Sequence, residues 1–178
     1  MSTCSITSGI ATIPCRDSIP GLSKFWVANY DDVTSVDIDE TTGFCSGITM
    51  ASSAVFYEFN VTPDSSMLEQ VPVVSAENGV AYWEQTLTAT FGKMDAAKRN
   101  LAKTLVIGNF VIIALDKNGA YWLVGKTGNQ DTGAYVNGGS MTTGTAGTDL
   151  SGLNLTFYSR VLYPSPETTK TVLDSVLT

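Results

Sequence analysis

Hydrophobic and polar residues alternate along two stretches of the chain, and these stretches predict its main strands. Between positions 83 and 91 the apolar or bulky residues fall at every second place with polar residues between them: Trp83, Leu87, Ala89 and Phe91 against Glu84, Thr86, Thr88 and Thr90. The stretch 153–161 repeats this pattern, and its polar side consists of Asn154, Thr156, Tyr158 and Arg160. A period of two is typical of a strand with one buried face.

A helix and a hairpin follow the first of these strands. Asp95 is a suitable N-cap residue, because its carboxylate can accept hydrogen bonds from the free N–H groups of a first helical turn. Ala97, Leu101 and Leu105 recur every four residues and predict one apolar stripe on a helix that ends before Gly108. The Asn-Gly pair within residues 116–119 predicts a tight turn between two β-forming segments. Residues 80–125 therefore form the expected centre of the fold.

The rest of the chain predicts further strands and three extended segments. Strands are expected at 24–29, 33–38 and 54–61, with a short one at 134–136. Residues 62–79 predict a long loop between strands, with a projecting hairpin as the alternative. Residues 1–23, which contain Pro14 and Pro20, and residues 167–178 predict terminal arms. The C-terminal arm is expected to form a helical turn or a docking strand. The expected fold of 1–178 is a single, mainly β domain: an antiparallel sandwich or partial barrel with one flanking helix and extended arms.

Composition and charge narrow the functional classes. Apolar residues make up 43% of the 178 positions and charged residues only 15%, which argues against disorder. The net charge of −7 and the scattered basic residues argue against a DNA-binding face. No apolar run approaches the roughly 18 residues that span a bilayer, so no membrane association is expected. The odd number of cysteines predicts free thiols, with a Cys4–Cys15 bridge as the alternative.

The residues that most enzymes and metal sites require are missing. The chain contains no histidine, which removes the usual general base and most zinc sites. Gly125-Lys126-Thr127 lacks the earlier glycine of a phosphate-binding loop, because Ala120 occupies that position. Five acids within residues 31–40 lack the spacing of a calcium loop and predict a solvated rim: Asp31, Asp32, Asp37, Asp39 and Glu40. We therefore expect no enzyme activity, cofactor or metal, although catalysis by two carboxylates stays open.

The C-terminal half of the chain has a distinctive order of motifs. A Gly/Thr-rich loop leads into Gly-Thr-Asp-Leu-Ser-Gly at 147–152, and the strand Leu-Asn-Leu-Thr-Phe-Tyr-Ser-Arg-Val and the pair Tyr163-Pro164 follow. Together with one helix flanking a β-sandwich, these motifs resemble the tail tube proteins of long-tailed bacteriophages over about residues 80–166. The resemblance implies that a long segment between strands, here 62–79, reaches a neighbouring ring. The first 79 residues contribute little beyond the long segment.

The resemblance implies a structural virion protein whose copies form rings, usually six-fold, that stack into a hollow conduit for genome delivery. Its partners would be other copies and other phage tail proteins, and DNA would pass without specific binding. The protein would assemble in the cytoplasm of the bacterial host and function in the virion tail. The candidate lumen-facing acids are Glu58 and Glu84. The candidate inter-subunit contacts are Ile6, Ile10, Ile13, Met67, Leu68, Val71, Val73, Val172 and Leu173.

Two other functions compete with this hypothesis. One is a capsid auxiliary or decoration protein, and the other is a β-sandwich binding module with an aromatic platform. Trp26, Trp83 and Trp122 are the candidates for such a platform, but each lies in an apolar strand pattern, which favours core packing. Ordered tubes would favour the tail protein, whereas a monomer that binds glycans would favour the module.

Overall fold

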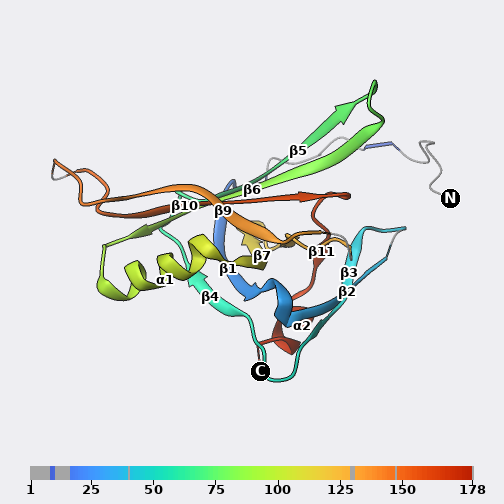
Figure 1. Cartoon of the computed structure of the whole chain (residues 1–178), viewed down its shortest axis with the longest axis horizontal. Helices are drawn as coiled ribbons and strands as arrows, with labels where there is room; N and C mark the ends of the chain where they lie inside the picture. The colour runs from blue at the N-terminus through green and yellow to red at the C-terminus, as the bar shows by residue number, and fades with distance from the viewer. Residues whose placement is uncertain (1–8, 11–16, 40, 129–130, 147, 178) are drawn as a thin grey trace.

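The computed structural model describes residues 9–10, 17–39, 41–128, 131–146 and 148–177, and it confirms a mainly β fold (Figure 1). Its described strands belong to one sheet that branches at β7 (Asn109–Asp116). β1 (Leu22–Asn29) lines one side of β7, and β4 (Tyr57–Asn60) lines the outer side of β1. On its other side β7 pairs first with β9 (Ala134–Thr142) and then with β8 (Tyr121–Val124).

Two branches of the sheet leave the second side of β7. One continues from β8 through β11 (Glu167–Thr168) and β3 (Phe44–Met50) to β2 (Val33–Asp39), which a short helical turn at Tyr30–Asp32 joins to β1. The other continues from β9 through β10 (Gly152–Val161) and β6 (Val80–Gly92) to β5 (Met67–Ser75). All described pairs are antiparallel except β3 with β11. Gly125 lies where the branches separate, with φ +91°, and a Cβ there would lie 2.8 Å from the Phe110 carbonyl oxygen.

Strands β1 and β7 are buried on both faces, which divides the interior into two cores. Phe25 and Ile112 face the first core, together with Phe157 of β10. Trp26 and Ile113 face the second core, which β3 and the C-terminal segment cover from the other side. Because both faces are covered, β7 reads as a continuous apolar run rather than an alternating one.

The helix α1 (Ala96–Ile107) begins as expected, since Oδ1 of Asp95 accepts a 2.8 Å hydrogen bond from the Lys98 backbone N–H. The pKa of Asp95 lies below its usual value mainly because of this bond. The predicted stripe is wrong in part: Leu105 is buried, but Ala97 and Leu101 are exposed, and Ala102 is the second buried residue. The helix covers one end of the sheet, so only a narrow face of it is enclosed.

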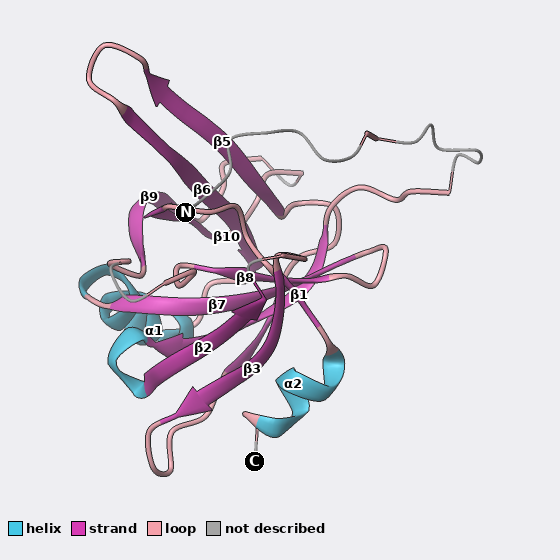
Figure 2. Ribbon diagram, turned by 90° about the vertical axis from the view of Figure 1, so that its right-hand side faces the viewer, coloured by secondary structure: helices cyan, strands magenta, loops and turns pink. Residues whose placement is uncertain are grey.

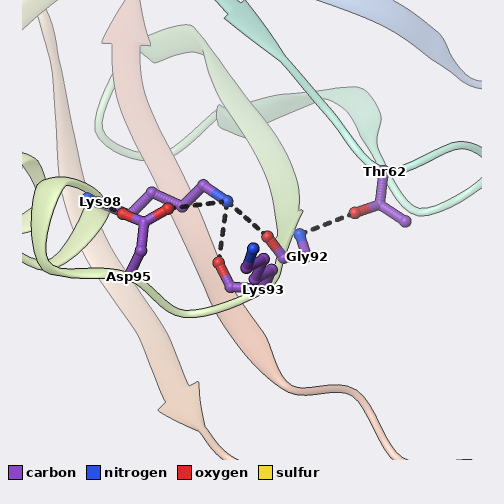
Figure 3. A network of polar contacts seen from close by, with 5 residues as sticks. All are labelled: Thr62, Gly92, Lys93, Asp95 and Lys98. Carbon is purple, nitrogen blue, oxygen red and sulfur yellow. Dashed lines mark hydrogen bonds and ion pairs between the residues drawn. The ribbon is translucent and has the colours of Figure 1, made fainter.

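Lys98 fastens the start of α1 to the end of β6 (Figure 3). Its Nζ donates hydrogen bonds to the carbonyl oxygens of Gly92 and Lys93, at 2.7 and 2.8 Å.

We expect Lys98→Met to lower the free energy of unfolding of the monomer by about 1–2 kcal/mol, because bonds to a charged donor are lost at a partly exposed site. Urea denaturation measures this loss. Lys103→Met, on an exposed lysine of the same helix, should change stability by less than about 0.5 kcal/mol; equal effects of the two substitutions would contradict the fastening role.

Residues 167–177 form both a short strand and a helix, as the two alternatives for this segment expected, but the predicted arm is wrong because they are part of the body of the protein (Figure 2). β11 bridges β3 and β8, and α2 (Lys170–Ser175) follows with Thr169 as its N-cap. Val172 and Leu173, two predicted inter-subunit contacts, lie in the second core, where Leu173 is only 2% exposed. They cover the apolar face that β1 and β7 would otherwise expose to water.

The predicted loop 62–79 is also wrong, and the alternative hairpin describes it better. Residues 67–75 form β5, which pairs with β6 along its whole length from Met67–Thr88 to Ser75–Val80. Gly79, with φ +62°, lies in the turn between them. At the N-terminus residues 9–10 and 17–20 are exposed and precede β1. Leu22 and Ser23, the last two residues of the predicted arm, belong to β1.

Candidate assembly surfaces

The hairpin of β5 and β6 projects from the body (Figure 2). Several of its apolar side chains are exposed. β10 accompanies β6 only as far as the Val161–Trp83 pair, so the last three residue pairs of the hairpin extend beyond it. Val74 is 72% exposed near the tip, and Met67, Val71 and Val80 are also exposed. Exposed valines that project on a two-stranded arm are typical of a contact surface rather than of a solvated loop.

The branch β9–β10–β6–β5 ends in an open strand edge on both sides. β5 pairs only with β6 among the described strands. β9 pairs with β7 only through Ala134 and Tyr135, so its far side is open from Val136 onward in the described part of the chain. Unpaired edges of this length present free N–H and C=O groups that another strand can bond. Pro72 removes one such donor from β5, which leaves 67–71 as its most suitable part.

One face of this branch points away from the first core and is called the outer face. On the two central strands, β6 and β10, it is polar and carries few charges, whereas Met67 and Val71 of β5 lie on the same face opposite Thr88 and Glu84. Glu84 lies near the hairpin end of the β6–β10 pair, where it accepts hydrogen bonds from the hydroxyls of Tyr158 and Tyr82 and forms a 3.6 Å ion pair with Arg160. Threonines and an asparagine occupy the rest of the two central strands: Thr86, Thr88, Thr90, Asn154 and Thr156. The alternation in the sequence thus corresponds to one polar face of these two strands, on which Thr90 is buried and bonded to Ser65 and Ser66.

Glu58, the other predicted lumen-facing acid, lies on a different surface. It belongs to β4 and forms a 3.0 Å ion pair with Lys24 of β1. Together with Phe59 of β4 and Leu101 of α1 it lines a mostly apolar groove of about 350 Å³ between the two elements. The structure therefore does not bring Glu58 and Glu84 together.

The predicted inter-subunit contacts are distributed over several environments. Met67 and Val71 are exposed on β5, whereas Leu68 and Val73 are half-buried on the same strand. Ile10 is fully exposed, and Ile6 and Ile13 lie outside the described residues. Val172 and Leu173 are internal, as described above.

The remaining sequence candidates have structural roles. The Asp131 carboxylate accepts hydrogen bonds from the backbone N–H groups of Thr127 and Gly128, and Gln85 accepts one from Gly125, so these three amides already have partners inside the protein. Asp39 accepts a 2.8 Å bond from the Thr41 N–H, and this bond is the main reason why its pKa lies below the usual value. No metal-like cluster of acids, histidines or cysteines exists among the described residues.

The tryptophans do not form a platform. Trp26 is buried and packs against Tyr121, with ring centroids 6.1 Å apart. Trp83 and Trp122 are half-buried on different branches of the sheet. Cys45 is a buried free thiol whose pKa is raised by burial, and Cys4 and Cys15 lie outside the described residues.

Sequence reasoning missed two features of these surfaces. The first is the open edge of β9, since the Gly-rich segment 137–142 gave no alternating signal. The second is Gln85, which is fully buried and accepts hydrogen bonds from the Gly125 N–H and the Ser159 hydroxyl at 3.0 and 2.7 Å. Its position among the inward-facing residues of β6 was the available signal.

The comparisons with known proteins add no relative. No protein-family model, curated protein or solved structure matches this chain. Of the helices in the described residues, none has the length and apolar character needed to cross a membrane.

Proposed function

We propose that this chain is a structural virion protein of a long-tailed phage, whose copies join into rings that stack into the tail tube. The observation that carries the proposal is the branch β9–β10–β6–β5 with an open edge at each end. A ring needs two different complementary edges on each subunit, because its contacts are heterologous. β5 of one copy and β9 of the next supply such a pair.

The strand directions support this pairing of β5 with β9 of the next copy. Neighbouring strands in the branch are antiparallel, so β9 and β6 run one way and β10 and β5 run the other. Rotation about a tube axis preserves these directions from copy to copy. β5 would therefore meet the next β9 in antiparallel orientation and continue the same pattern around a closed barrel, which removes both open edges.

The polar outer face suits the wall of a channel for DNA. Its charged residues are Glu69, Glu84 and Arg160, so acids exceed bases by one on each subunit. Most other side chains on β6 and β10 are neutral and polar, which keeps the wall hydrated. A weakly negative wall offers no cluster of cations for phosphates, so DNA would pass without specific binding. The proposal keeps Glu84 in the lumen and leaves Glu58 outside it.

The test is negative-stain electron microscopy over a concentration series, combined with a variant of the β5 edge. Wild-type protein should form rings or hollow tubes of uniform width. Met67→Lys with Val71→Lys should abolish rings while leaving thermal unfolding of the monomer unchanged, because both side chains are exposed and edge lysines oppose strand addition.

Leu162→Lys is the matched control, since Leu162 is exposed beyond the end of β10. It should assemble as the wild type does. Normal rings from the β5 variant would refute the pairing of β5 in one copy with β9 in the next. A wild-type protein that remains monomeric at every concentration would favour a capsid decoration protein or a binding module.

A further inference from the structure

The helix α1 and the strand β4 border a groove of about 350 Å³ in the body of the protein. Phe91 of β6 and Leu153 of β10 are buried and form its floor. Its walls consist of apolar side chains from the two bordering elements: Tyr57, Phe59, Leu101 and Leu105. Tyr57 is 64% exposed and Leu101 is 45% exposed, so the upper part of the groove is open to solvent.

The groove also exposes the backbone edge of β4. All four residues of this strand, Tyr57–Asn60, line it. Successive side chains of a strand point to opposite faces, so four in a row can line one groove only where the edge of the strand borders it. β4 pairs only with β1 among the described strands, and no backbone hydrogen bond from another described element reaches its other side. About half of the backbone groups in an antiparallel pair point away from the partner strand, and in β4 these groups face the groove.

One end of the groove is closed where α1 begins. The chain leaves β4 there and crosses to the end of β6, where the Gly92 N–H donates a 3.0 Å hydrogen bond to Oγ1 of Thr62 (Figure 3). Lys98, which lines the groove, donates to the Gly92 carbonyl oxygen at the same place. The opposite end, where β4 begins, carries the exposed Tyr57.

The groove offers no uncompensated charge to a ligand. Among the described residues that line it, only Glu58 and Lys98 are charged. Glu58 forms a 3.0 Å ion pair with Lys24, and Lys98 forms a 3.6 Å ion pair with Asp95. Because each charge already has an opposite charge within the protein, an uncharged occupant suits this apolar groove better than a charged one.

We propose that the groove binds an extended, uncharged segment of another protein, which adds as a strand to the free edge of β4. The backbone of the segment bonds the free N–H and C=O groups of β4, and every second side chain points down between β4 and α1. A helix in the groove would cover the apolar floor but leave the β4 edge unbonded, whereas a strand satisfies both. The inference goes beyond the proposed function and does not depend on it, because the groove lies on a different surface from the outer face.

The size of the groove limits the contact to a few residues of the segment. Its volume of about 350 Å³ lies at the lower end of the roughly 300–1,000 Å³ of ligand pockets. A flexible segment also loses conformational freedom when it binds, so the affinity is modest. Since no ion pair forms with the occupant, raising the salt concentration should not weaken binding.

Solution NMR with a synthetic peptide tests the groove. The probe is acetyl-Thr-Val-Ser-Val-Ser-Val-Thr-amide, which carries no charge and alternates valine with polar residues. Binding should shift the backbone amide signals of residues 57–60 and of the α1 residues that line the groove, and it should slow hydrogen exchange at alternate amides of β4.

N-methylated versions of the peptide test for strand addition. Alternate N–H groups of a strand point to opposite edges, so methyl groups on the valine nitrogens block one edge and methyl groups on the serine nitrogens block the other. One of these two peptides should lose binding and the other should retain it. Binding of both, or of neither, would contradict a strand that pairs with β4 along one edge.

Leu101→Glu tests the groove against the rest of α1. Leu101 lines the groove and is partly exposed, so glutamate should leave thermal unfolding unchanged while it places a charge beside the valines of the peptide. We expect the affinity for the peptide to fall at least about tenfold. Val106→Glu is the matched control, since Val106 is 56% exposed on the same helix but does not line the groove. This control should bind the peptide as the wild type does, and equal losses from the two substitutions would overturn the inference.

Other results of the NMR experiment would also overturn it. Unchanged β4 amides at about 1 mM peptide would mean that this edge does not accept a strand. Changes confined to β5 or β9 would mean that the peptide extends those edges instead, which would leave the ring proposal intact. Slow exchange at all β4 amides without peptide would mean that a segment of the same chain or of a second copy already covers the edge. Binding at β4 by a protein that forms no rings would support the groove while the proposed function fails.

Discussion

Leu173→Ala is expected to lower the free energy of unfolding of the monomer by about 2–5 kcal/mol, the range for truncating a buried leucine to alanine and leaving a cavity. Leu173 is only 2% exposed and lies in the second core with Val172 and Val176. A loss of this size is a large part of the total stability of a domain. Urea denaturation under conditions where the protein is monomeric measures it directly.

Leu162→Ala is the matched control for this substitution. Leu162 is 59% exposed, so its loss should change stability by less than about 0.5 kcal/mol. If the C-terminal segment were instead a detachable arm for contacts between subunits, Leu173→Ala would leave the monomer as stable as the wild type and would weaken assembly. That result would contradict the packing of α2 described above.

Gln85→Leu is the second substitution with a large expected effect. The Gln85 side chain donates to the Ser165 hydroxyl at 2.8 Å and accepts from the Gly125 N–H and the Ser159 hydroxyl. Leucine has a similar volume but leaves these buried groups without their partner. Each unsatisfied group costs about 1–3 kcal/mol, so we expect a total loss of about 3 kcal/mol or more in the free energy of unfolding.

Thr156→Val tests whether this loss comes from burial. Thr156 lies half-buried on the polar outer face of the neighbouring strand β10. Removing its hydroxyl should change monomer stability by less than about 0.5 kcal/mol. Gln85→Leu at wild-type stability, in thermal or urea unfolding, would show that the polar groups around position 85 find other partners and would contradict the network.

Part of the candidate site could be predicted because it depends on short-range patterns. The polar faces of β6 and β10 follow from alternation within each strand, and the observed register places Thr156 opposite Thr88. The exposed β5–β6 hairpin could be anticipated only as an alternative to a loop, since Pro63 precedes strand β5 and Pro72 lies within it. Proline is tolerated on an edge strand, where its missing N–H faces no partner.

Other parts could not be predicted, because they depend on which distant segments meet. The apolar pattern of the C-terminal segment is compatible with an arm on a neighbouring subunit or with a helix on the same one. The choice depends on whether an apolar face elsewhere remains uncovered, and in this chain β1 and β7 leave such a face. Similarly, the open edge of β9 exists only because β7 pairs with it for two residues and then with β8.

The sequence by itself determined the local elements of this protein: the alternating strands β6 and β10, the Asp95 cap of α1 and the turn after Asp116. Each depends on interactions between residues close together in the chain, which period and capping chemistry reveal. Only the tertiary structure decided what covers each apolar face and which strand edges stay open. These features depend on contacts between residues far apart in the chain, and a residue pattern records which side chains share a face but not what that face meets.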